Sequence, residues 1–131
     1  QQYDKINLFE PMNEPQVYFP GDQPGIIDTQ FGRFGVAICY DLRFPELFAQ
    51  LAALNVQWII VPAAFPKERI SDWWCLLAER AREVGRHVIG VNAVGDDGVN
   101  LFGGTSMVCG PGGEIIVQAD DSSEKIIDLE L

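Results

Sequence analysis

The sequence predicts an α/β layered protein, and three of its features carry that prediction. Between residues 26 and 92, short apolar runs rich in β-branched residues alternate with stretches whose apolar residues recur at helical spacing. Beyond residue 104 the pattern changes to short strand-like runs separated by turn residues. The 131 residues are 47% apolar, which is an ordinary content for the core of one globular domain.

Residues 1–24 are expected to form loops, because prolines and a glycine interrupt any long regular element there. Those residues are Pro11, Pro15, Pro20, Gly21 and Pro24. The first two strands are expected at residues 26–29 and 34–38, with a turn at Gly32 and Arg33 between them.

Two helices are expected further along the chain. Residues 44–54 place their apolar side chains on one helical face. A second helix is expected to begin at a cap formed by Ser71 or Asp72 and to run to about Val84. Its inward-facing residues would be Trp73, Leu76, Leu77, Ala81 and Val84.

The remaining strands are predicted from apolar content and turn residues. Residues 56–61 are nearly all apolar, as in a strand covered on both faces, and residues 87–92 form a similar run. The rest of the prediction is a turn at residues 95–98 followed by short strands at residues 105–109, 114–117 and 126–129.

Cys39 stands where an apolar strand-like run gives way to a helical pattern. Pro45 and Glu46, shortly after it, are typical of the first turn of a helix. This layout is that of a nucleophile elbow with sulfur in place of hydroxyl, and a nearby helix start would favour the thiolate. The alternative is that Cys39 is a small buried hydrophobe at the end of a core strand.

Composition excludes several classes of partner. With 9 basic and 19 acidic residues the net charge is −10, and no cluster of Lys or Arg exists to bind nucleic acid or an anionic membrane. The longest apolar run, residues 58–65, is too short to span a bilayer. Three widely spaced cysteines indicate neither a disulfide framework nor a metal site, so a reducing cytoplasm is expected.

Five segments in register resemble the nitrilase (carbon–nitrogen hydrolase) superfamily, closest to its amidase and ω-amidase-like branches. The most specific is Gly-Arg-Phe-Gly-Val-Ala-Ile-Cys-Tyr-Asp-Leu-Arg-Phe-Pro-Glu at residues 32–46. The others are residues 3–9, 20–22, 80–83 and the pair 104–106 with 111–114. The resemblance covers essentially the whole chain. It implies part of a four-layer α-β-β-α sandwich, with residues 1–131 a partial domain that lacks its N-terminal portion and C-terminal tail.

The resemblance also implies a site. Family members use a Glu–Lys–Cys triad, in which Cys39 would be the nucleophile and Lys5 the lysine, with the triad glutamate expected before this sequence. Glu14 resembles a second glutamate near the lysine, with Glu10 as the neighbouring alternative. The backbone N–H of Tyr40 would be an oxyanion donor.

Other residues are assigned more loosely. Arg43 and Glu83 are expected to pair as structural charges, and Phe65 and Pro66 to lie at the pocket rim. Which residues touch substrate is left open. Trp73 and Trp74 are interpreted as core residues or, alternatively, as a pocket floor. Two further cysteines, Cys75 and Cys109, are expected to be inert, and His87 to be structural.

The implied function is hydrolysis of non-peptide carbon–nitrogen bonds in small linear amides, ω-amides or N-carbamoyl compounds. It would proceed through a cysteine acyl-enzyme and release ammonia. One alternative is a true nitrilase with the same triad. Another is a non-catalytic fragment or interaction module that retains the elbow as a relic. No metal or organic cofactor is implied, a homo-oligomer is expected, and this chain alone is expected to be inactive.

Overall fold

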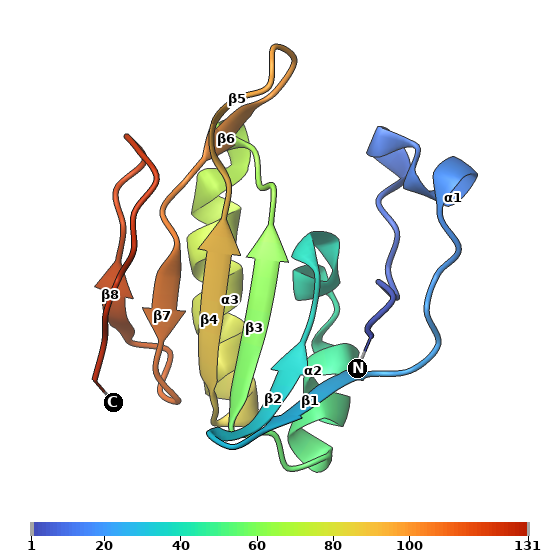
Figure 1. Cartoon of the computed structure of the whole chain (residues 1–131), viewed down its shortest axis with the longest axis vertical. Helices are drawn as coiled ribbons and strands as arrows, with labels where there is room; N and C mark the ends of the chain where they lie inside the picture. Colours follow the sequence, from blue (N-terminus) through green and yellow to red (C-terminus); the bar gives the residue numbers. More distant parts are fainter. Residues whose placement is uncertain (1, 131) are drawn as a thin grey trace.

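The apolar runs of the sequence pair into one mixed sheet, with helices packed on it. The structure is a computed structural model that describes residues 2–130. Within those residues the sheet has six strands in the order β1-β2-β3-β4-β7-β8 (Figure 1). The strands are β1 (Gly25–Thr29), β2 (Gly32–Val36), β3 (Trp58–Ala63), β4 (His87–Asn92), β7 (Met107–Cys109) and β8 (Ile115–Gln118).

Strand direction places the ends of the central strands at one edge. β2, β3 and β4 run parallel to one another, whereas β1, β7 and β8 pair antiparallel to their neighbours. The β2–β3 connection contains α2 (Pro45–Ala53) and the β3–β4 connection contains α3 (Ile70–Val84). The segments that leave the carboxyl ends of β2 and β3 therefore begin at the same edge, where open α/β sheets form their sites.

One face of the sheet carries both helices, and the hydrophobic core lies between the helices and the sheet. Figure 1 shows α3 behind β3 and β4. A Cβ at Gly90 of β4 would lie 2.5 Å from Leu77 and 2.6 Å from Trp73, so only glycine permits this approach of α3. The buried core residues on the strands alternate with partly exposed ones, as the twofold period of a strand requires. The sheet and this helix layer correspond to two of the four layers that the family resemblance implies.

Two segments, one at the N-terminus and one after β4, flank the sheet edge where β2 and β3 end. The N-terminal segment contains η1 (Glu10–Met12) and α1 (Glu14–Val17), single turns in a region expected to be loops. A separate hairpin of β5 (Val94–Asp96) and β6 (Leu101–Gly103) projects beyond the sheet at the top of Figure 1. It is tied to the segment after β3 by the Gly103 N–H, which donates to the Phe65 carbonyl at 3.0 Å.

The two expected helices and most expected strands are confirmed, with corrections at their ends. Gly32 and Arg33 lie inside β2, so the turn falls at residues 30–31 instead. The turn expected at 95–98 falls later, because Val94–Asp96 is itself a strand. β7 begins at Met107 because Gly104 and Thr105 have left-handed backbones, with φ of 55° and 54°.

Two expectations fail outright. The strand at 126–129 does not form within the described residues, where Ile126 is 93% exposed and has no strand partner. Ser71 and Asp72 do not cap the second helix. Residue Arg69 is its N-cap, because the preceding turn η3 (Lys67–Arg69) already starts the helical path.

Candidate active site

Cys39 lies at a strained turn between the sheet and a helical segment. After β2, the Ala37 N–H still donates to Ile60 of β3 at 3.1 Å, and the chain then enters η2 (Cys39–Arg43). The φ angle of Cys39 is 47°, a left-handed conformation that non-glycine residues rarely adopt. Such strain at a strand-to-helix turn is the geometry of a nucleophile elbow, as the sequence predicts.

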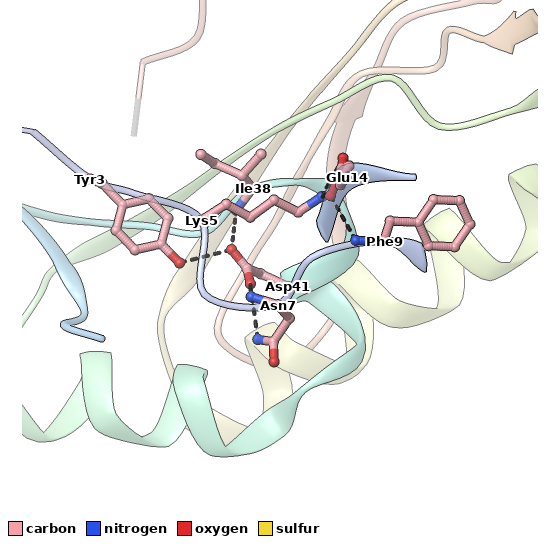
Figure 2. Close-up of polar contacts among 7 residues, drawn as sticks. All are labelled: Tyr3, Lys5, Asn7, Phe9, Glu14, Ile38 and Asp41. Carbon is pink, nitrogen blue, oxygen red and sulfur yellow. Dashed lines mark hydrogen bonds and ion pairs between the residues drawn. The ribbon is translucent and has the colours of Figure 1, made fainter. Parts of the chain in front are cut away.

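Asp41 ties the N-terminal segment to this turn. Its carboxylate is fully buried and accepts four hydrogen bonds (Figure 2). The Asn7 N–H and side-chain amide donate to Oδ1 at 2.8 and 2.9 Å, and the Tyr3 hydroxyl and the Ile38 N–H donate to Oδ2 at 2.8 and 2.9 Å. Burial, and then this carboxylate, raise the pKa of Tyr3 well above its usual value. Residues on both sides of Lys5 are thus hydrogen-bonded to Asp41, which also holds Ile38 on the other side of Cys39.

Lys5 and Glu14 form a shielded ion pair beside the elbow. Lys5 Nζ lies 2.7 and 3.0 Å from the two Glu14 oxygens, and Glu14 also accepts from the Phe9 N–H at 2.7 Å (Figure 2). The side chains are only 11% and 22% exposed. Among the described residues, Glu14 is thus the glutamate that contacts Lys5, whereas Glu10 makes no contact with it. This geometry favours Glu14 over Glu10.

Cys39, Lys5 and Glu14 line one cleft of about 640 Å³. Tyr40 lines the same wall, with its ring 4.9 Å from that of Phe9. The opposite wall comes from the segment after β3 and from the β5–β6 hairpin. It includes Phe65, Pro66, Arg69, Asn100 and Phe102. Phe65 and Pro66, expected at the pocket rim, do line this cleft, and Phe65 is buried in its wall.

The protonation of Cys39 departs from the expectation. Burial raises the pKa of its thiol above the ordinary value, and the nearby carboxylates of Glu14 and Asp41 add to this rise. A hydrogen bond to the backbone at Ala64 and the positive charge of Lys5 lower the pKa, but only in part. The expectation of a favoured thiolate is therefore wrong for this chain, since burial outweighs the charges that oppose it.

Arg43 does not pair with Glu83. Its guanidinium binds Asp72 of α3 at 2.7 Å and lies 5.9 Å from the centre of the Phe65 ring. Glu83 instead binds Arg80 at 2.9 Å, one turn away on the same helix. Side chains three residues apart on a helix are neighbours whatever the helix packs against, which explains why Glu83 pairs with Arg80 and not with Arg43.

The other residues singled out in the sequence lie away from the cleft. Trp73 is fully buried in the core and donates to the Thr105 carbonyl at 3.1 Å, so its interpretation as a core residue is confirmed. His87 stacks on Trp58 with ring centres 4.5 Å apart, a structural contact. Cys109 is buried, which raises its pKa to about 11, whereas Cys75, also expected to be inert, is exposed and so lacks the shielding from solvent that would make it so.

Two absences are limited to residues 2–130. No group of three or more His, Cys, Asp or Glu side chains there is arranged to hold a metal ion. No helix in that range is long and apolar enough to cross a membrane.

Apart from Phe65 and Pro66, the sequence does not point to the residues of the opposite wall of the cleft. Arg69, Asn100 and Phe102 carry no motif, and the hairpin reaches the cleft only through tertiary contacts. For Arg69, a signal was available, since it follows the carboxyl end of a predicted parallel strand by few residues.

Comparisons with known proteins agree with this geometry. The family model described as "Carbon-nitrogen hydrolase" matches residues 1–131. The 2-oxoglutaramate amidase of Paenarthrobacter nicotinovorans is 36% identical over 90% of this chain and 42% of its own length. Omega-amidase YafV of Escherichia coli K12 is 37% identical over 98% of this chain and 50% of its own length.

A solved structure is similar in both fold and sequence. It is a variant of the amidase from Nesterenkonia sp. AN1, which shows covalent addition of the acetamide moiety of fluoroacetamide at its active site cysteine. It superposes with a TM-score of 0.83 at 32% identity, over 91% of this chain and 45% of that one. The chain thus spans about half the length of the relatives it matches. On the family match across all its residues, this chain belongs to the carbon–nitrogen hydrolase (nitrilase) family.

Proposed function

We propose that Cys39 is the nucleophile of an amidase that cleaves the carbon–nitrogen bond of small linear amides and releases ammonia. The observation that carries the proposal is the position of Cys39 on a strained elbow, in one cleft with the Lys5–Glu14 ion pair. The amidase names of the relatives support the same reaction class.

The proposed reaction begins when the Cys39 sulfur attacks the amide carbon and its proton passes to a general base. Negative charge then develops on the amide oxygen, which the backbone N–H of Tyr40 and the Lys5 ammonium would stabilise. The leaving nitrogen takes up the proton and departs as ammonia, which leaves a thioester on Cys39. Water attacks the thioester, and the carboxylic acid and free thiol are released.

A general base is needed because burial raises the pKa of the Cys39 thiol, so that little thiolate exists beforehand. We propose that this base is a glutamate outside residues 1–131 and that this chain is one part of a longer hydrolase domain. Glu14 is then the residue that orients Lys5, since it already holds the ammonium through both carboxylate oxygens. Location in the cytoplasm and assembly as a homo-oligomer stay predictions.

The test is ammonia release by the full-length protein on a panel of small amides, including butyramide and succinamate. Cys39→Ser and Cys39→Ala should each lose at least ~10³-fold in kcat/KM, because covalent catalysis is removed. Cys75→Ser is the matched control, since that thiol is exposed on α3 away from the cleft. Near-normal turnover by both Cys39 variants would refute the assignment and leave the elbow as a relic.

Nitriles belong in the same panel, because a true nitrilase would use the same thiol. The isolated chain of residues 1–131 should show negligible turnover if the base lies outside it. Turnover by the isolated chain comparable with that of the full-length protein would point to Glu14 as the working base.

A further inference from the structure

Asn92 is a buried polar residue that the proposed reaction does not use. It is the last residue of β4 and pairs with Ala63, the last residue of β3. Burial alternates along β4, and Asn92 occupies a core-facing position at which it is only 8% exposed. A buried amide needs hydrogen-bond partners to offset the loss of water, so its partners indicate what it holds in place.

The side-chain amide of Asn92 holds the segment that leaves β3. Its Oδ1 accepts from the Phe65 N–H at 2.7 Å, and its Nδ2 donates to the Phe65 carbonyl at 3.4 Å. The same Nδ2 donates to the Gly104 carbonyl at 2.8 Å. One orientation of the amide satisfies all three contacts, because the N–H requires the oxygen and the carbonyls require the NH₂ group. One side chain thereby joins the end of β3 to the residue that follows β6.

These contacts bear on Cys39 through Ala64. Ala64 lies just beyond the paired residues of β3, where the strand ladder has ended. Its two neighbours in the chain are nevertheless held. The Ala63 carbonyl accepts a backbone hydrogen bond at 2.9 Å from the segment after β4, and Asn92 holds Phe65. The Cys39 thiol forms its backbone hydrogen bond with Ala64, and this bond lowers the pKa of the thiol.

From these contacts we infer that Asn92 is a positioning residue for the Cys39 nucleophile, because it fixes the backbone of Ala64 where it meets the sulfur. This inference rests on the proposed function and adds a residue that does not itself line the cleft. Because Asn92 is uncharged, replacing it with another neutral residue changes the surroundings of the thiol through geometry alone. The charged groups that act on the thiol or line its cleft are unchanged by such a replacement: Lys5, Glu14, Asp41, Arg43, Glu68 and Arg69.

The pH dependence of Cys39 alkylation by iodoacetamide tests this role in the full-length protein. The midpoint of the curve reports the pKa of the thiol, whereas a change in access alters the rate at every pH without moving the midpoint. Asn92→Ala should release the Ala64 segment, move the midpoint to higher pH and slow alkylation at pH 7 by roughly 10-fold. In the same variant, kcat/KM for butyramide should fall by roughly 10- to 100-fold, because the nucleophile is misplaced.

Ser106→Ala is the matched control. The Ser106 hydroxyl accepts from the Asn92 N–H at 2.9 Å and donates to the Asn92 carbonyl at 3.3 Å. Its removal therefore disturbs the same strand end but leaves the side-chain amide in place. Ser106→Ala should lower the stability to urea and leave the Cys39 midpoint unchanged. An equal shift in Ser106→Ala and Asn92→Ala would mean that any loosening of the strand end alters the thiol, and it would overturn the inference.

Asn92→Ser provides a milder change, which keeps the test decisive if Asn92→Ala does not fold. Its hydroxyl is too short to join Phe65 to Gly104, but the hydroxyl and a water molecule can fill the space of the amide. The midpoint should move in the same direction as in Asn92→Ala, by a smaller amount. Because alkylation needs no substrate, such a shift supports the inference even if no amide in the panel is hydrolysed. An unchanged midpoint in a folded Asn92 variant would refute the role of Asn92 while leaving Cys39 as the nucleophile.

Discussion

The two walls of the cleft are built differently. On the wall that carries Cys39 and Glu14, here called the elbow wall, Lys5 is 11% exposed in a two-contact ion pair, and behind this wall the fully buried Asp41 accepts four hydrogen bonds. On the opposite wall, the β5–β6 hairpin meets the segment after β3 through backbone contacts such as the Gly103–Phe65 hydrogen bond. Arg69 on that wall is exposed.

The difference separates chemistry from selectivity. Buried polar groups with several partners are costly to disturb, so the elbow wall holds its geometry within narrow limits. Loop residues without such partners can change at little cost to stability. Substitutions of Cys39, Lys5 or Asp41 should therefore have the largest effects on turnover or stability, whereas substitutions of exposed residues on the opposite wall (the buried Phe65 excepted) should mainly change which amide is preferred.

The largest effect on the elbow wall, apart from Cys39 itself, is expected at Lys5. Lys5→Met keeps the length of the side chain but removes the charge that faces the developing oxyanion, and should cost ~10²- to 10³-fold in kcat. Glu14→Gln keeps one acceptor oxygen for Lys5 and should lower kcat by less than Lys5→Met does. Steady-state ammonia release measures both, and a larger loss for Glu14→Gln would show that Glu14 does more than orient the lysine.

Asp41→Asn should be the most destabilising change in this wall. In either orientation of the new amide, its NH₂ group faces a backbone N–H, that of Asn7 or that of Ile38, which now donates to the carboxylate. Leaving buried donors unpaired should lower the free energy of unfolding by about 2–4 kcal/mol. Tyr3→Phe removes a single donor and should cost about 1 kcal/mol. Urea denaturation of the full-length protein measures both, and equal losses would contradict the four-donor arrangement as the source of stability.

The same contrast explains what the sequence could predict. The elbow at Cys39 and the Lys5 segment can be recognised locally, because both depend on residues that are adjacent in the sequence. For Cys39 these are the end of a strand and the start of a helix. The partners of Asp41 lie 34 and 38 residues away, and periodicity contains no information about such contacts. The partner of Arg43 was mispredicted for the same reason, since Asp72 reaches it only once α3 packs beside η2.

The exposure of Cys75 shows the limit of a helical pattern. Periodicity identifies the buried stripe of α3, with Trp73, Leu77 and Ala81 fully covered. Cys75 lies about 200° around the helix from Trp73, which places it on the solvent side. A cysteine is usually buried, but the position of Cys75 on the helix overrides that general tendency.

The pH dependence of alkylation should distinguish Cys39, in the cleft, from the two thiols outside it. The Lys5 charge lowers the pKa of Cys39, so Lys5→Met should raise it and shift the alkylation curve of Cys39 to higher pH. Cys75, exposed on α3, is the internal control, because the Lys5→Met substitution should leave its labelling rate unchanged. Cys109 should label only after denaturation, because it is fully buried with a pKa raised to about 11. Peptide mass mapping measures all three, and an unshifted Cys39 curve would place Lys5 too far from the thiol to matter.

The smallest effect is expected where the two walls meet, at the Arg43–Asp72 ion pair. Their contact is short, at 2.7 Å, but the side chains are 31% and 47% exposed. Solvent screens such a pair, and ordering two long side chains offsets part of the attraction. A double-mutant cycle with Arg43→Gln and Asp72→Asn should therefore give a coupling of about 0.2–1 kcal/mol, which falls further at high salt.

An Arg43–Asp72 coupling energy well above that range would mean that Arg43 is held rigidly, like the buried groups of the elbow wall, and that its ion pair fixes η2 against α3. The cation–π contact of Arg43 with Phe65 at 5.9 Å gives a way to distinguish the two cases. If Phe65→Leu weakens the Arg43–Asp72 coupling, the aromatic ring helps to hold the guanidinium in place, and Phe65 then connects the two walls. If the coupling stays small and does not depend on Phe65, then Asp41 belongs to the rigid part of the site and Arg43 to the part that can change. The two residues lie only two positions apart in the same turn.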